Sequence, residues 1–145
     1  MVLKIELKPG ERIILGSSVI TNSDHRTRLF IEGDAPILRE KDILTAETAT
    51  SPAKTIYFTV QLMYLNKNIE EQRELYFELV HDFLGAAPSA LRIIDGINSK
   101  ILTGSLYHAL KETKKLIEYE QELIGNAQTG GGDLSKNLTD NSKPD

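Results

Sequence analysis

The segment Ser51–Leu65, SPAKTIYFTVQLMYL, decides the fold, because the chain changes there from a strand-like to a helical pattern. Ser51 is a residue type favoured as a helix N-cap, and Pro52 suits the first helical position, where no N–H is required. The apolar residues of the segment are Ile56, Tyr57, Phe58, Val60, Leu62, Met63, Tyr64 and Leu65. They lie almost all round a helix, so we expect this helix to be buried centrally or against a partner.

Upstream, residues 1–44 have the pattern of short antiparallel strands. Val2–Leu7 alternates apolar and charged residues, and residues 26–31 alternate in the same way. Turn residues separate the runs at Pro9-Gly10, Asn22-Ser23-Asp24 and Gly33-Asp34. The other predicted strands are Arg12–Leu15, which Val19 and Ile20 continue after a bulge or turn, and Ile37–Leu44. This pattern predicts a small antiparallel sheet or barrel.

Downstream, three more helices are predicted, over Ile69–Leu84, from Pro88 through Ile101, and over Ser105–Ile124. Gly125 is predicted to end the last of them. Residues 126–145 are rich in Gly, Ser, Thr, Asn and Asp and predict a disordered tail. The fold class is therefore α+β. Residues 1–44 are predicted to form a β region and candidate binding part, residues 45–125 a helical region and candidate partner or oligomer interface, and residues 126–145 the tail.

The composition excludes several classes of protein. The chain has 145 residues, a net charge of −4 and no Cys, so disulfides and thiolate chemistry are excluded. No apolar run approaches the roughly 20 residues of a membrane-spanning helix, and the first residues lack the pattern of a secretory signal. We therefore expect a cytoplasmic protein without a membrane partner. The acidity lies downstream, because residues 1–44 hold seven basic and seven acidic residues.

Catalytic and metal-binding motifs are weak in this sequence. Glu78 and His81 have the Glu-x-x-His spacing of a carboxylate-bridged metal site, but no second copy of the motif exists. The Gly-rich segment at 129–133 has neither a preceding strand nor a following Lys-Ser or Lys-Thr, so it is no phosphate loop. We expect no enzyme, no cofactor and no metal.

Basic residues of the predicted sheet are the candidate binding residues. Lys4 and Lys8 share one strand face, and Arg26, Arg28 and Phe30 share another. Basic groups around one aromatic ring suit single-stranded RNA, since phosphates pair with the cations and a base stacks on the ring. Two alternatives remain open: the basic residues form an ordinary solvated face, and Phe30 belongs to the core.

Three blocks of the chain resemble the FlbT family of flagellum-synthesis regulators. They are residues 7–14, LKPGERII, residues 35–44, APILREKDIL, and residues 52–65, PAKTIYFTVQLMYL. The resemblance covers residues 1–124. It implies action after transcription on the 5′ untranslated leader of flagellin mRNA, with the small protein FlaF as counterpart. Family members lower or raise flagellin synthesis, so the resemblance leaves the sign open.

A second resemblance, of residues 10–40, is to the carbon-storage-regulator RNA-binding proteins called CsrA. It is carried by residues 10–16, GERIILG, by Arg28–Ile31, and by Ala35-Pro36 with Arg39-Glu40. It implies that Arg39 contacts RNA, because a matching arginine reads message leaders in those strand-swapped dimers. The chain departs from the pattern in the shorter gap before Arg39, in Leu7 at a basic position, and in its helical half.

Two functional hypotheses follow from the sequence. In the first, the chain is an RNA-binding regulator of flagellin mRNA, with Arg39, Arg28, Arg26, Lys4, Lys8 and Phe30 as candidate RNA contacts. In the second, it is a protein-interaction module that binds FlaF, flagellin or a second copy of itself as a homodimer. Its candidate interface residues are Tyr57, Met63 and Tyr64, on the helix with apolar residues all round.

Overall fold

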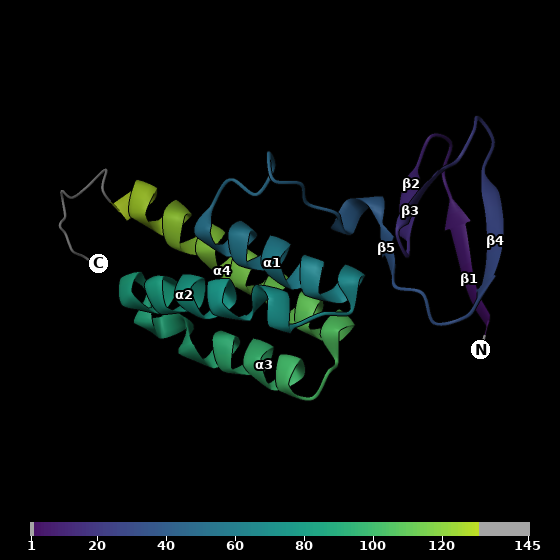
Figure 1. Cartoon of the computed structure of the whole chain (residues 1–145). Helices are drawn as coiled ribbons and strands as arrows, with labels where there is room; N and C mark the ends of the chain where they lie inside the picture. Colours follow the sequence, from purple (N-terminus) through teal and green to yellow (C-terminus); the bar gives the residue numbers. More distant parts are fainter. Residues whose placement is uncertain (1, 131–145) are drawn as a thin grey trace. The chain divides into compact units, whose positions relative to one another are not determined.

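The computed structural model describes residues 2–130, with side chains through residue 126 (Figure 1). The chain forms two compact units that divide between Leu79 and Val80, within α2. Five strands precede four α-helices, as predicted for an α+β protein. The elements are β1 Val2–Leu7, β2 Arg12–Leu15, β3 Ser18–Thr21, β4 Thr27–Glu32, β5 Ile37–Arg39, η1 Glu40–Asp42, α1 Pro52–Asn66, α2 Glu70–Ala86, η2 Pro88–Ala90, α3 Leu91–Leu102 and α4 Leu106–Gly130.

The strands form two small antiparallel sheets. One contains β1 and β4, and the other has the order β3-β2-β5. Ile5 and Leu7 of β1 and Ile13 of β2 are buried together, and half-buried apolar residues pack around them. These half-buried residues are Ile20, Leu29, Ile31 and Ile37. The predicted alternation is confirmed, because the apolar face of each sheet contributes to one shared core.

The turn after β2 closes a hairpin with a two-residue loop. Leu15 pairs with Ser18, so Gly16 and Ser17 form the loop, and Gly16 has a φ of 64°. A positive φ favours glycine at this position of a tight hairpin turn. Residues 18–21 are therefore a separate strand, β3, which settles the alternatives of bulge or turn in favour of a turn.

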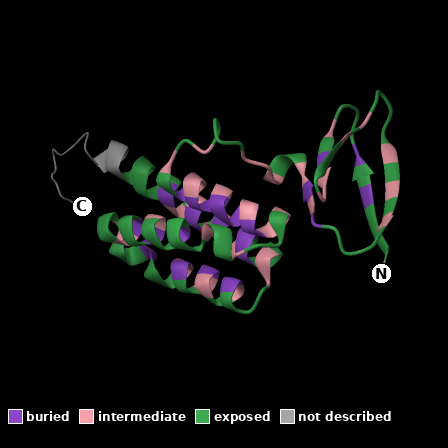
Figure 2. Cartoon of the chain, in the orientation of Figure 1, coloured by how far each residue is buried: buried purple, intermediate pink, exposed green. Residues whose placement is uncertain are grey.

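Helix α1 begins and packs as its sequence predicts. The Ser51 side chain accepts a hydrogen bond from the Lys54 N–H, and Pro52 is the first helical residue. Ala53, Ile56, Tyr57, Thr59, Val60, Gln61 and Met63 are all buried (Figure 2). The prediction of a centrally buried helix is confirmed.

Polar side chains of α1 hold the segment that contains β5 and η1. The Tyr64 hydroxyl accepts from the Ile37 N–H and donates to the Ile37 carbonyl, both at 3.0 Å. Gln61 makes the same double contact with the backbone of Leu44, at 2.9 Å. These side chains satisfy backbone groups that have no neighbouring strand on that side, which fixes β5 against the helix.

Three predicted boundaries were wrong. The strand expected over Ile37–Leu44 ends at Arg39, because residues 40–42 form the turn η1 and the Glu40 carboxylate accepts a hydrogen bond from the Arg12 N–H. The third helix starts with the 3-10 turn η2. Helix α4 continues through Gly125 to Gly130, since one glycine costs a helix only about 1 kcal/mol. The rest of the predicted disordered tail, 131–145, lies outside the described residues.

In the second unit, α3 and α4 pack against each other. Helix α3 buries the stripe Ile94, Ile97 and Ile101, and the first half of α4 buries Ala109, Leu110 and Leu116. Leu123 and Ile124, further along the same helix, are exposed. The apolar burial of α4 therefore lies in its first part.

Candidate nucleic-acid interface

The β1–β4 sheet exposes one face, which we call the outer face. Its residues are paired across the strands: Val2 with Glu32, Lys4 with Phe30, and Glu6 with Arg28. All six are exposed, whereas their sequence neighbours Ile5, Leu7, Leu29 and Ile31 belong to the core or its margin. Strict alternation in both strands therefore builds an exposed surface of mixed polar and apolar character.

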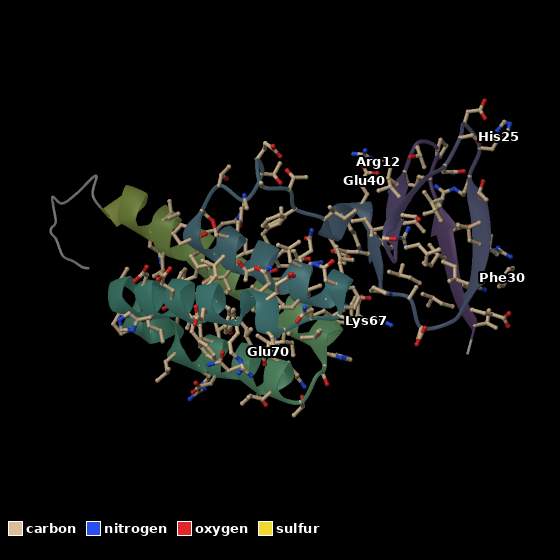
Figure 3. The ribbon with its side chains drawn as sticks, in the orientation of Figure 1. Arg12, His25, Phe30, Glu40, Lys67 and Glu70 are labelled. Atoms are coloured by element: carbon tan, nitrogen blue, oxygen red, sulfur yellow. The ribbon has the colours of Figure 1, made fainter. Side chains whose placement is uncertain are left out.

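Phe30 is the most exposed aromatic side chain of the described residues, with 65% of its surface accessible. Figure 3 shows it pointing away from the two sheets. The alternative that Phe30 belongs to the core is thus excluded. Its cross-strand neighbour is Lys4, and Arg28 lies two residues away on the same face.

The basic groups of this surface are partly compensated. The Arg26 guanidinium, just before β4, lies 3.6 Å from the Glu6 carboxylate, and both side chains are more than half exposed. Lys4, Arg26 and Arg28 stand against Glu6 and Glu32, so the surface carries one net positive charge. The structure brings four of the six predicted RNA contacts together: Lys4, Arg26, Arg28 and Phe30.

Arg39 lies elsewhere and connects the two sheets. It pairs with Ile13, whose side chain is in the core, so Arg39 faces the interior side of its sheet. Its Nη2 atom donates to the carbonyl of Glu6 at 2.7 Å and to the Glu11 carboxylate at 3.1 Å. Its Nε atom is buried and has no hydrogen-bond partner among the described residues. Arg39 therefore joins β5 to β1 and to the turn that follows β1.

Glu11 is the residue that sequence reasoning missed. It is the salt-bridge partner of Arg39, although the two residues are 28 positions apart in the sequence. The Lys8 N–H donates to the Glu11 carboxylate at 2.9 Å. This hydrogen bond, with a smaller contribution from Arg39, lowers the pKa of Glu11 below its ordinary value of 4.5. Only the pairing of β2 with β5 reveals the contact.

Lys8 borders an open hollow of about 600 Å³ beside Arg39, not the outer face. The hollow is also lined by Glu11, Glu40 and Lys41. Lys8, Arg39 and Lys41 stand against Glu11 and Glu40 in this lining, which therefore carries one net positive charge. Lys8 and Arg39 thus form a second location, separate from the residues around Phe30.

The structure corrects the predicted partner interface on α1. Tyr57 and Met63 are buried, with 2% and 0% of their surfaces accessible, so neither is presented to a partner. Tyr64 is half-buried, and its hydroxyl is engaged by Ile37. When apolar residues lie all round a helix, the sequence shows that they must be buried. It does not show whether elements of the same chain or a partner protein bury them. The exposed apolar side chains of the first unit's helices include Leu75 and Phe77 on α2.

The described residues contain neither a metal-binding cluster nor a membrane-spanning helix. No group of three or more His, Asp or Glu side chains is placed to hold a metal ion within residues 2–130. In the same part of the chain, no helix combines the length and the hydropathy needed to cross a membrane.

Comparison with known proteins identifies the family. The family described as "Flagellar protein FlbT" matches residues 3–124. A "Probable flagellum biosynthesis repressor protein FlbT 1" of Bradyrhizobium diazoefficiens is 57% identical over 126 residues, which are 86% of each chain. A "Probable flagellum biosynthesis repressor protein FlbT" of Rhodopseudomonas palustris is 53% identical, over 86% of this chain and 98% of its own. No solved structure matches.

A more distant relative extends the match further along the chain. The "Flagellum biosynthesis repressor protein FlbT" of Caulobacter vibrioides is 38% identical over 139 residues, covering 92% of this chain and 99% of its own. The family match includes both sheets, all the residues around Phe30 and the pair Arg39 and Glu11. This chain therefore belongs to the FlbT family of flagellar proteins, a family of regulators and not of enzymes.

Proposed function

We propose that this chain is a cytoplasmic repressor of flagellum biosynthesis that acts after transcription, by binding the 5′ untranslated leader of flagellin mRNA. The sign of the regulation follows the names of its relatives, which are called flagellum biosynthesis repressors. The RNA contact is assigned to the outer face of β1–β4 and the preceding Arg26. FlaF is the proposed protein counterpart.

The observation that carries this proposal is that the Phe30 side chain is exposed beside the basic side chains of Lys4 and Arg28. An aromatic side chain that is 65% exposed gains little from burial within its own chain. A sheet that presents an aromatic ring beside Lys4 and Arg28 has the parts that single-stranded RNA requires, a stacking platform and phosphate partners. The net acidity of the whole chain does not oppose this contact, because residues 1–44 are neutral and the excess of acidic residues lies downstream of them.

For Arg39 we propose an indirect role. Its Nη2 atom is engaged by Glu6 and Glu11 and its Nε atom is buried, so the two-atom fork that a bidentate contact with a base edge requires is not available. Arg39 holds β5 to β1 and so fixes the position of one sheet against the other. Because β1 supplies half of the outer face, this contact also positions the outer face. A variant of Arg39 is thus expected to lower RNA affinity through stability, equally for leader and scrambled RNA.

The alternative is a protein-interaction module without RNA contact, and one observation favours it. Leu75 and Phe77 of α2 are 46% and 53% exposed, which is more apolar surface than a helix usually leaves to water. In this alternative FlaF or flagellin binds the helical part, and regulation of flagellin synthesis is indirect.

The test is titration of the purified full chain with a labelled flagellin leader and with a scrambled RNA, at two salt concentrations. Loss of one stacked base costs about 1–3 kcal/mol, so Phe30→Ala should weaken binding by about 5- to 150-fold. Arg28→Gln should reduce the logarithmic salt slope by about 0.7. The matched control is Phe77→Ala, an exposed aromatic residue on α2. Binding by none of the folded proteins, even with FlaF added, would support the alternative.

A further inference from the structure

The outer edge of β4 is open. β4 pairs with β1 on one side, and no strand within residues 2–130 pairs with its other side (Figure 1). In an antiparallel ladder every second residue directs its N–H and C=O away from the paired neighbour. β4 therefore presents a row of backbone donors and acceptors over Thr27–Glu32, which is long enough for another strand to pair with it.

The side chains of β4 are self-complementary about Phe30. If a second β4 runs antiparallel and Phe30 lies opposite Phe30, Arg28 lies opposite Glu32 of the second copy, and Glu32 lies opposite its Arg28. Opposite charges that face each other across strands stabilise pairing, and like charges destabilise it. Charges on an edge strand usually prevent association. Here the two signs are spaced equally on either side of one residue, so a two-fold axis matches them.

The interior side of β4 supports the same pairing. Leu29 and Ile31 are only half-buried, and Leu3, which pairs with Ile31, is 46% exposed. With Phe30 at the centre, Leu29 lies opposite Ile31 of the second copy, and Ile31 lies opposite its Leu29. The half-buried apolar side chains of each copy would then be buried against those of the other copy. This burial would add to the backbone hydrogen bonds between the two strands.

We propose that two copies of this chain associate through the outer edges of β4, centred on Phe30, to form a continuous four-stranded antiparallel sheet with the order β1-β4-β4-β1. The contact is isologous and closes on itself, which limits the assembly to a dimer. Pairing at an edge leaves both faces of each sheet as they are. The proposal goes beyond the proposed function and does not depend on RNA.

The register gives the proposal a charge-exchange test. Arg28→Glu alone places glutamates opposite each other twice in the dimer, and Glu32→Arg alone places arginines opposite each other twice. The double variant Arg28→Glu with Glu32→Arg restores both attractive pairs with the signs exchanged. Lys4→Glu is the matched control, because it makes the same change of charge on the outer face but on β1, away from the edge.

The measurement is sedimentation equilibrium of the full chain, with folding checked by circular dichroism. We expect a dimer for the wild type, a dimer dissociation constant raised at least about tenfold in each single variant, and recovery to within about threefold in the double variant. Lys4→Glu should dimerise like the wild type. A monomeric wild type, an Arg28→Glu variant as dimeric as the wild type, or a double variant no better than the single ones would each overturn the proposal.

Discussion

Replacing Tyr64 by Phe removes one hydroxyl and tests how the sheets are held to α1. That hydroxyl both accepts from and donates to the backbone of Ile37, at 3.0 Å in each case. Phe keeps the ring and its packing, so the change isolates the two hydrogen bonds. Tyr57→Phe is a parallel test, because the Tyr57 hydroxyl donates a hydrogen bond to the carbonyl of Asp42 at 2.7 Å.

The magnitude follows from the number of bonds lost. A hydrogen bond within a protein contributes about 0.5–1.5 kcal/mol, so Tyr64→Phe should lower the free energy of unfolding by about 1–3 kcal/mol. Tyr57→Phe should lower the free energy of unfolding by at least about 0.5–1.5 kcal/mol, for the hydrogen bond to Asp42. For a chain of this size the Tyr64 variant should melt roughly 3–10 °C lower than the wild type.

The assay is urea unfolding followed by circular dichroism, with the midpoints compared at unchanged slope. Tyr64→Phe and Tyr57→Phe must each be less stable than the wild type. A Tyr64 variant as stable as the wild type would refute the inference that this hydroxyl fixes β5. It would also reopen the prediction that Tyr64 serves a partner interface.

Two other perturbations test the interior and the pair of sheets. Met63→Asp should unfold the protein, because Met63 is 0% exposed and a buried unpaired carboxylate costs several kcal/mol. A folded variant that merely loses a partner would contradict this placement. The folded-state pKa of Glu11 is lowered from 4.5, so its stabilising contribution should be complete above pH 4.5 and lost as the pH falls through the lowered value. Glu11→Gln should show a smaller acid-induced loss of stability, as measured by melting temperature between pH 3 and pH 7.

Local patterns predicted most of the fold. The alternation in β1 and β4 and the Ser51-Pro52 start of α1 are local signals, and the structure contains those elements at nearly the predicted boundaries. The end of α4 was not predictable from Gly125, because a single glycine weakens a helix without stopping it. The turn η1 depends on the hydrogen bond from the Arg12 N–H to the Glu40 carboxylate. A contact between residues so far apart in the sequence cannot be predicted from the local pattern of residues.

The candidate site was predictable only in part for the same reason. Alternation placed Arg28 and Phe30 on one face, but only the register of β1 with β4 brings Lys4 beside them. Arg39 was selected from a resemblance, and its commitment to Glu11 depends on how the two sheets pack. Tyr57 and Met63 were expected on a surface, since periodicity describes how apolar a helix is and not which neighbour covers it.

The two proposals are linked through Glu32 and Phe30. In a single copy this carboxylate lies two residues from Phe30 on the outer face, where it repels phosphate. In the proposed dimer each Glu32 faces Arg28 of the second copy. This pairing offsets the repulsion by Glu32 and the attraction of Arg28 for phosphate together, so any gain in affinity must come from the Phe30 rings. The same pairing sets two Phe30 rings next to each other at the two-fold axis, so an RNA strand that crosses the axis meets two stacking platforms, each contributing about 1–3 kcal/mol. The dimer should then bind RNA more tightly than the monomer, and by thermodynamic reciprocity RNA must favour the dimer by the same factor.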